Sequence, residues 1–212
     1  MGTLDALSLA MGTAWTSGIN LYATVAALGI AGRMEMIQLP ANLQVLMHPG
    51  VIAVACVMYF IEFFADKVPY VDSGWDVLHT FIRIPAGALL AARSLGNMNP
   101  ALELMALLAG GTIAMAAHGT KATLRLAINA SPEPFSNWTA SVTEDLTVLG
   151  GLWMIFHHPL LMIILVVSFV ALVIWLVPKL FRLAKRGFQA LRARTRGIKP
   201  DQSTPTSSPQ VS

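Results

Sequence analysis

Four carboxylate side chains lie at the edge of an apolar segment, in MYFIEFFADKVPYVDSGWD (58–76), which contains Glu62, Asp66, Asp72 and Asp76. Glu62 and Asp66 are four residues apart, so on a helix they share one face. A carboxylate in hydrocarbon is costly, so Glu62 should face other helices, be protonated or be paired. The acids therefore predict either a proton or cation site or a neutralised contact between helices.

Ionisable side chains recur at helical spacing in two longer stripes. The first stripe, with spacings of four, three and four, consists of Asp72, Asp76, His79 and Arg83. The second stripe, with spacings of three and four, consists of His118, Lys121 and Arg125. The two stripes either neutralise each other or line an outward-facing cavity. A metal site is a third alternative, because histidines and aspartates are suitable ligands, but no HExxH or paired CxxC spacing supports it.

A polar interruption, Ser17-Gly18-Ile19-Asn20, occurs within an otherwise apolar N-terminal segment. Glycine loosens a helix, and serine and asparagine supply polar groups where lipid supplies none. A freed backbone next to an amide is one way to coordinate an ion or substrate inside a membrane. The alternative is close helix packing through small and polar residues.

The composition indicates which elements hold these side chains. The 212 residues are 55% hydrophobic and only 12% charged, whereas soluble domains have about 25% charged residues. A bilayer core needs about 20 predominantly apolar residues per helix. The sequence therefore predicts an all-α membrane protein with about five spans, at about 6–32, 49–66, 76–95, 101–122 and 159–178.

Two further segments, one polar and one apolar, precede the last span. NASPEPFSNWTASVTEDL (129–146) is expected to be an outer loop, and residues 147–156 are apolar but too short to span alone. They are expected to form an interfacial or re-entrant piece. The transmembrane domain would cover residues 1–178 and a tail of 13 residues, 200–212, is expected to be disordered.

Residues 179–199 contain eight Lys or Arg and no acid. They predict a basic amphipathic helix on anionic lipid or a solvated flank, and nucleic acid is not expected as a partner. Basic residues favour the cytoplasmic side. The C-terminus is therefore expected in the cytoplasm and the N-terminus outside, in a bacterial inner membrane. This orientation places the charged stripes near the outer boundary.

An internal repeat is indicated by two weak similarities. His48-Pro49 matches His158-Pro159, and the segment around Gly18 and Asn20 matches that around Gly119 and Lys121. Repeat one would cover about 6–75 and repeat two about 100–178, with residues 76–95 as the connecting span. The predicted topology makes the two halves antiparallel, a pattern of secondary transporters. A duplicated bundle without transport activity is the alternative.

Three stretches, SGINLYATVAALGIAGR, EFFADKVPYVDSGWD and RLAINASPEPFSNWTASVTED, resemble the bacterial membrane proteins catalogued as domain of unknown function 4126. The resemblance covers about residues 1–180. It implies an integral membrane protein and supplies no activity.

These observations predict a small transporter or channel-like permease that works as a homo-oligomer within membrane lipid. Its pathway is expected to contain the following residues: Ser17, Gly18, Asn20, Glu62, Asp66, Asp72, Asp76, His79, Arg83, His118, Lys121 and Arg125. The alternatives are a membrane enzyme acting on a lipid headgroup, with His79, Asp76 and Arg83 at the boundary, and a non-catalytic scaffold. No cofactor is expected, because the sequence has no Walker, Rossmann or nucleophile-elbow pattern.

Overall fold

The computed structural model describes residues 2–68, 70–130 and 134–196, and within them every regular element is helical. The chain divides into two units, Met1–Val173 and Ile174–Ser212, with the boundary inside the last helix. The elements are α1 (Thr3–Ile19), α2 (Leu21–Arg33), the 3₁₀ helix η1 (Ala41–Met47), α3 (Pro49–Ala65), α4 (Val71–Ser94), α5 (Pro100–Asn129), α6 (Pro134–His157) and α7 (Pro159–Arg196).

Proline marks the start of several of these helices: α3, α5, α6 and α7 each begin at one. Proline suits the first helical position because its missing N–H has no partner there anyway. His48 and Asn99 precede two of these prolines and cap the helices, with Nδ1 of His48 accepting from Gly50 N and Oδ1 of Asn99 accepting from Leu102 N. Local sequence therefore accounts for these boundaries.

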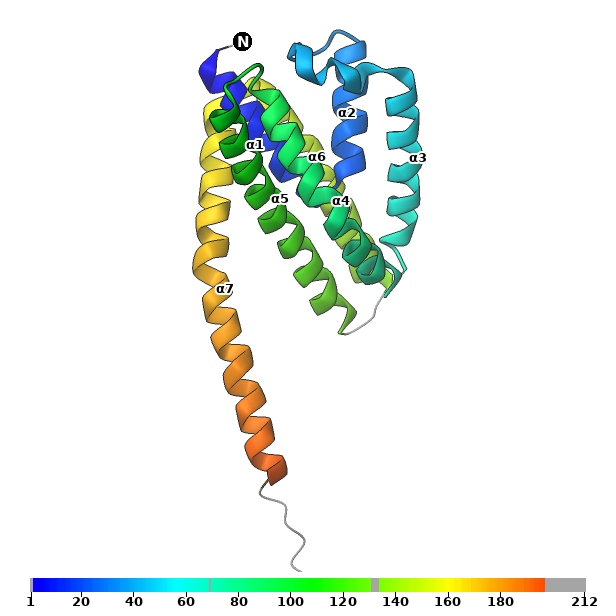
Figure 1. The fold of residues 1–212 in the computed structure, drawn as a ribbon. Helices are drawn as coiled ribbons and strands as arrows, with labels where there is room; N and C mark the ends of the chain where they lie inside the picture. Colours follow the sequence, from blue (N-terminus) through cyan, green and yellow to red (C-terminus); the bar gives the residue numbers. More distant parts are fainter. Residues whose placement is uncertain (1, 69, 131–133, 197–212) are drawn as a thin grey trace, which may run out of the picture. The chain divides into compact units, whose positions relative to one another are not determined.

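Helices α1 and α2 form a hairpin that enters the bundle and turns back (Figure 1). Near its start, Ser8 Oγ donates to Ile155 O at 3.2 Å. At the turn, Asn20 lies against Asp145, the midpoint of α6. At its end, Arg33 donates to the carbonyl of Met47. Both ends of the hairpin thus lie at the same end of the bundle, and its tip lies half-way along it.

Helices α3, α4, α5 and α6 run between two ends of the bundle. At one, called the Asn97 end, the side chains of Asn42 and Asn97 meet at 3.3 Å. At the other, called the Lys67 end, Lys67 Nζ donates to Ser141 Oγ at 3.2 Å. A helix that passes from one end to the other therefore also passes the tip of the α1–α2 hairpin.

Small residues let α1 and α4 approach α5 closely. A Cβ placed on Gly18 would lie 2.5 Å from the carbonyl oxygen of Ala114 and 2.7 Å from Ala117 Cβ. A Cβ on Gly87 of α4 would lie 2.5 Å from Ala114 Cβ of α5. Close backbone approach of this kind is common in membrane bundles, where packing replaces the hydrophobic drive between helices.

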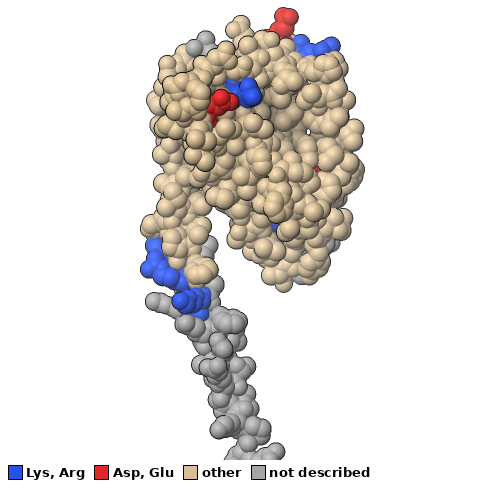
Figure 2. Space-filling model, in the orientation of Figure 1, with Lys and Arg blue, Asp and Glu red and all other residues tan. Residues whose placement is uncertain are grey.

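Among the described residues, two helical segments, Pro100–Asn129 and Pro159–Lys179, are long and apolar enough to cross a membrane. The bent pair η1 and α3, with an angle of 64° between its helices, makes a third if it is one span. Helices α4 and α6 do not meet the same criterion of length and apolarity, and α4 carries the buried charged residues Asp72, Asp76 and Arg83. In the view of Figure 2, almost all of the visible surface over residues 2–173 belongs to uncharged residues. Many charged side chains of α3 to α5 are instead buried, among them Glu62, Asp76, Arg83, Lys121 and Arg125.

Several predictions can now be compared with these elements. The all-helical class is confirmed for the described residues. Helices α3, α4, α5 and α7 overlap the segments predicted as spans at 49–66, 76–95, 101–122 and 159–178, and the count of five spans stays a prediction. The single span predicted at 6–32 is instead two helices, because the backbone of Asn20 is extended (φ −145°, ψ 102°).

The loop predicted at 129–146 is wrong over most of its length, because α6 starts at Pro134 and continues to His157. The polar residues of this segment misled the prediction: Asn137, Ser141 and Glu144 follow helical spacing and face other polar groups in the interior. The apolar piece 147–156 is the second half of the same helix, with Val148, Leu152 and Ile155 buried.

The two His-Pro pairs occupy equivalent positions, because His48 and His158 each separate one helix from the next. The rest of the similarity is not reproduced, since the first half breaks at Asn20 whereas Lys121 lies inside the continuous helix α5. The inverted repeat stays a prediction. Of the basic segment 179–199, residues up to 196 continue α7, while 197–199 and the tail predicted at 200–212 lie outside the described residues.

Candidate functional site

Arg83 lies in the middle of α4 with a fully buried side chain. Its Nη2 donates to Glu62 Oε1 of α3 at 2.5 Å, and its Nη1 donates to Asp76 Oδ1 at 3.1 Å. Asp76 precedes Arg83 by two helical turns and therefore lies on the same face of α4. One guanidinium thus joins carboxylates of two helices without contact with solvent.

Helix α5 adds a second buried cation, Lys121. Its Nζ donates to Glu62 Oε1 at 3.2 Å and to Asp66 Oδ2 at 3.1 Å. The same nitrogen lies 3.3 Å from Glu144 Oε2 and 3.9 Å from Asp76 Oδ1. A single ammonium group therefore contacts carboxylates from α3, α4 and α6.

One turn further along α5, Arg125 contacts acids of α6 and of the C-terminal end of α3. It is bidentate to Glu144, through Nε at 3.0 Å and Nη2 at 2.6 Å, and Nη2 also donates to Asp66 Oδ2 at 3.2 Å. Its Nη1 donates to the backbone carbonyls of Asp66 at 2.8 Å and Asn137 at 3.3 Å. The planar guanidinium suits this fork of acceptors.

Amides close the cluster towards the Lys67 end. Asn129 Nδ2 donates to Asp72 Oδ1 at 2.8 Å and Oδ2 at 3.0 Å, and Asn137 Nδ2 donates to Asn129 Oδ1 at 3.0 Å. Lys67 Nζ lies 2.9 Å from the centroid of the Phe63 ring. Each of these polar groups is bonded within the protein, as burial requires.

The ion pairs connect eight side chains into one cluster, which we call the buried ionic network: Glu62, Asp66, Asp72, Asp76, Arg83, Lys121, Arg125 and Glu144. Five are acids and three are bases, so full ionisation would leave two uncompensated negative charges in the interior. Each uncompensated charge in the interior carries a desolvation cost of roughly several kcal/mol. Bound protons or a cation would remove this cost.

Three carboxylate oxygens of the network have no hydrogen-bond donor among the described residues: Glu62 Oε2, Asp66 Oδ1 and Asp76 Oδ2. All three are buried, and all three acids lie within 4 Å of Lys121. Each of these oxygens can accept a proton or contact a cation without breaking an existing bond. They mark the place within the network where its charge can change.

Both predicted histidines adjoin the network. His118 Nδ1 lies 3.2 Å from Nη1 of Arg83, which can only donate, so Nδ1 accepts and His118 is neutral with its proton on Nε2. His79 Nδ1 lies 2.9 Å from the carbonyl of Trp75 and therefore carries a proton. Its Nε2 accepts from Tyr22 Oη at 3.0 Å. The histidines thus hold defined tautomers at the edge of the network.

The tip of the α1–α2 hairpin contacts the same region. Oδ1 of Asn20 caps α2 by accepting from Ala23 N at 3.0 Å, and its Nδ2 donates to Asp145 Oδ1 at 3.3 Å. The other oxygen of Asp145 accepts from Tyr59 Oη at 3.1 Å. Ser17 and Gly18 have a packing role here, because Ser17 Oγ donates to Ala14 O within α1 and Gly18 contacts α5. The broken hairpin and the network are therefore neighbours.

One cavity reaches the network from the side and is lined by residues of α1, α5, α6 and α7. It has a volume of about 170 Å³, and Lys121 and Glu144 form part of its wall. Glu144 is the most exposed member of the network, with 16% of its side chain accessible. Three threonines of the wall donate their hydroxyl protons to carbonyls of their own helices, which leaves their oxygens as acceptors: Thr120, Thr143 and Thr147.

The structure therefore brings together most of the predicted residues. The acidic and basic stripes do face each other, and Asn20 lies at their margin. Sequence reasoning missed Glu144 and Asp145 as site residues, because α6 was taken for a loop. The spacing of Asn137, Ser141 and Glu144 was the available signal. Sequence reasoning also missed Tyr22 and Tyr59, because nothing in the local sequence pattern distinguishes these two residues from aromatic residues at a membrane interface.

Metal binding finds no support in the geometry: within the described part of the chain, no three His, Cys, Asp or Glu side chains are grouped to hold an ion. Among known protein families, the one described as Domain of unknown function (DUF4126) matches residues 7–179. No curated protein and no solved structure matches the chain.

Proposed function

Because the chain belongs to the family of domain of unknown function 4126, whose description gives no activity, we propose from the geometry of the site that it is a small proton-linked permease of the membrane. The observation that carries the proposal is the composition of the buried ionic network, with five carboxylates against three cations. A network that must hold protons to be neutral can also release them.

The α1–α2 hairpin supports the same function. A helix broken at mid-depth is found in membrane proteins where its ends line a pathway or a binding site. Asn20 at this break touches Asp145, and Tyr22 in the first turn of α2 donates to His79. A movement of the hairpin would therefore change the surroundings of the network directly.

The cavity beside Glu144 is the proposed access route. It joins the network at its least buried carboxylate, and the hydroxyl oxygens in its wall are acceptors that suit water or hydronium. Two residues of its wall that come from different helices, Lys121 and Glu144, are 3.3 Å apart. A proton that reaches Glu144 is thus one contact from the ammonium that links the other carboxylates.

The topology that we propose places the network in the inner half of the bilayer. A span from Pro159 to Lys179 begins next to Ile155, at the Asn97 end, and would leave the membrane on the opposite side. The basic residues that follow favour the cytoplasm. The N-terminus would then lie outside and the C-terminus in the cytoplasm, as expected from the sequence. The proposed location of the network differs from that expectation, because the sequence analysis placed the charged stripes near the outer boundary.

A non-catalytic scaffold is the second candidate function, because each cation of the network also forms ion pairs with acids of other helices. The lipid-headgroup enzyme is not favoured, since His79, Asp76 and Arg83 are at most 4% exposed and are bonded to other residues rather than placed at a boundary. The scaffold predicts a stable bundle without flux, which separates it from the permease.

The test is proton uptake by proteoliposomes that contain a pH-sensitive dye, driven by a potassium diffusion potential. We expect uptake with the wild-type chain and a loss of at least about tenfold, or ~1.4 kcal/mol in barrier height, with Glu62→Gln, Asp66→Asn or Glu144→Gln. Glu103→Gln is the control, because Glu103 lies in the first turn of α5 outside the network. No uptake by a folded wild-type chain would refute the permease and favour the scaffold.

A further inference from the structure

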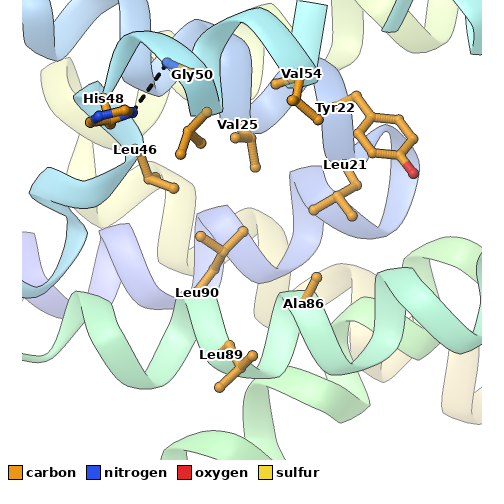
Figure 3. Close-up of a pocket in the computed structure, with 12 residues that line it drawn as sticks. Leu21, Tyr22, Val25, Leu46, His48, Gly50, Val54, Ala86, Leu89 and Leu90 are labelled. Atoms are coloured by element: carbon orange, nitrogen blue, oxygen red, sulfur yellow. Dashed lines mark hydrogen bonds between the residues drawn. The ribbon is translucent and has the colours of Figure 1, made fainter. Parts of the chain in front are cut away.

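An apolar groove of about 630 Å³ lies between α2, α3 and α4 and is separate from the buried ionic network. Its wall contains Leu21 and Val25 of α2, Val54 of α3, and Ala86 and Leu90 of α4 (Figure 3). Helices α3 and α4 meet at Glu62 and Arg83 and diverge towards the Asn97 end. The groove occupies the space that this divergence opens.

We propose that this groove binds one acyl chain of an anionic phospholipid. The side of the bundle around it is apolar: α3 exposes Val57, Phe60 and Phe64, each with at least 58% of its surface accessible. Such a side faces the acyl chains of the bilayer, and water in a groove with this lining would lack hydrogen-bond partners. An acyl chain is the occupant that both the lining and the setting favour.

The inner end of the groove fits the methyl end of such a chain. Tyr22 closes this end, and its hydroxyl points away from the other lining side chains in Figure 3. That hydroxyl is already donated to His79 Nε2 at 3.0 Å. A ligand with a polar inner end would therefore find no free partner there, whereas a hydrocarbon end contacts only the ring of Tyr22 and aliphatic side chains.

The outer end of the groove fits an anionic headgroup. His48 is exposed at this end, and its Nδ1 accepts from Gly50 N at 3.1 Å, so the remaining ring nitrogen, Nε2, carries a proton that can be donated. Arg33 lies beside it, with Nη1 3.4 Å from the carbonyl of Met47, and is also exposed. A phosphate at this position would accept hydrogen bonds from both side chains.

The test is native mass spectrometry of the full chain released from nanodiscs that contain equal amounts of phosphatidylglycerol and phosphatidylcholine. We expect one phosphatidylglycerol to stay bound to the wild-type chain. Ala86→Phe fills the groove and should lower the retained fraction at least about tenfold, whereas Ala127→Phe, at an exposed position on α5, should leave it unchanged. Arg33→Gln should remove the preference for phosphatidylglycerol.

Equal lipid retention by folded Ala86→Phe and wild-type chains would overturn the site. Equal retention of the two lipids by the wild-type chain would overturn the assignment of the headgroup. Folding is checked by circular dichroism and gel filtration, and Val54→Trp replaces Ala86→Phe if that variant does not fold. The result does not depend on proton uptake, so this inference and the proposed function fail separately.

Discussion

Arg83 and Glu62 form an ion pair in which neither side chain is accessible to solvent. The pair joins the middle of α4 to the last turn of α3, and Glu62 also accepts from Lys121 of α5. Three helices therefore depend on one carboxylate. In a hydrocarbon setting such a group stays ionised only because its partners are fixed by packing.

Replacing Glu62 should therefore destabilise the bundle as well as slow proton uptake. Glu62→Gln leaves Arg83 paired with Asp76, and Lys121 paired with Asp66 and Glu144, but it weakens the hydrogen bonds that position 62 accepts from both cations. A hydrogen bond to a charged group contributes about 1.5–3 kcal/mol. We expect a clear fall in the midpoint of thermal unfolding in detergent. Glu35→Gln, at an exposed position, should leave the midpoint unchanged; an equal fall in both variants would contradict the role of the pair.

The α1–α2 hairpin predicts which positions share a side of the membrane. In a chain with Cys56→Ala, single cysteines at Leu4 and Met36 should react with an impermeant maleimide from the same side, because both ends of the hairpin lie at the Asn97 end. A cysteine at Tyr70, which is 67% exposed beyond α3, should react from the opposite side. Labelling of positions 4 and 36 from opposite sides would show that residues 6–32 cross the membrane.

Gly18 should tolerate no larger residue without loss of stability. Gly18→Ala places a methyl group within 3 Å of the backbone of α5, and overpacking of this kind costs roughly 1–3 kcal/mol. Gly119→Ala is the matched change, because Gly119 lies in α5 and a methyl group added there would meet no atom within 4 Å. Thermal unfolding should separate the two variants, and equal midpoints would exclude tight α1–α5 packing at Gly18.

Asn20 combines a capping role with a contact to a carboxylate, and its variants should separate the two. Asn20→Ala removes the cap of α2, at a cost of about 1 kcal/mol. Asn20→Asp keeps the cap but puts a second carboxylate 3.3 Å from Asp145. Its repulsion requires both acids to be ionised, so the loss of stability should grow as pH rises.

Thermal unfolding at pH 5 and pH 8 measures this difference. The stability of Asn20→Asp relative to the wild-type chain should be lower at pH 8 than at pH 5, while that of Asn20→Ala should change little. A pH-independent deficit in Asn20→Asp would mean that Asp145 is not close to position 20, and the placement of the hairpin tip against α6 would be wrong.

The sequence by itself determined most of the apolar helical segments and, to within one residue, the starts of α3, α5 and α7. Helical spacing also placed Asp72, Asp76, His79 and Arg83 on one face of a helix, and local periodicity is sufficient for that. The cost of burying charge in an apolar helix further indicated that the acids must be paired or protonated.

The tertiary structure decided which residues meet. Glu144 lies on α6, whose polar sequence resembles that of a loop. Only the packing against α3, α4 and α5 shows which side chains its polar residues bind. The return of α2 at Asn20 depends on contacts with the 3₁₀ helix and with Asp145, which lies 125 residues further along the chain than Asn20. Helical spacing in the sequence shows which residues share one face of a helix. Which faces contact each other depends on how all the helices pack together.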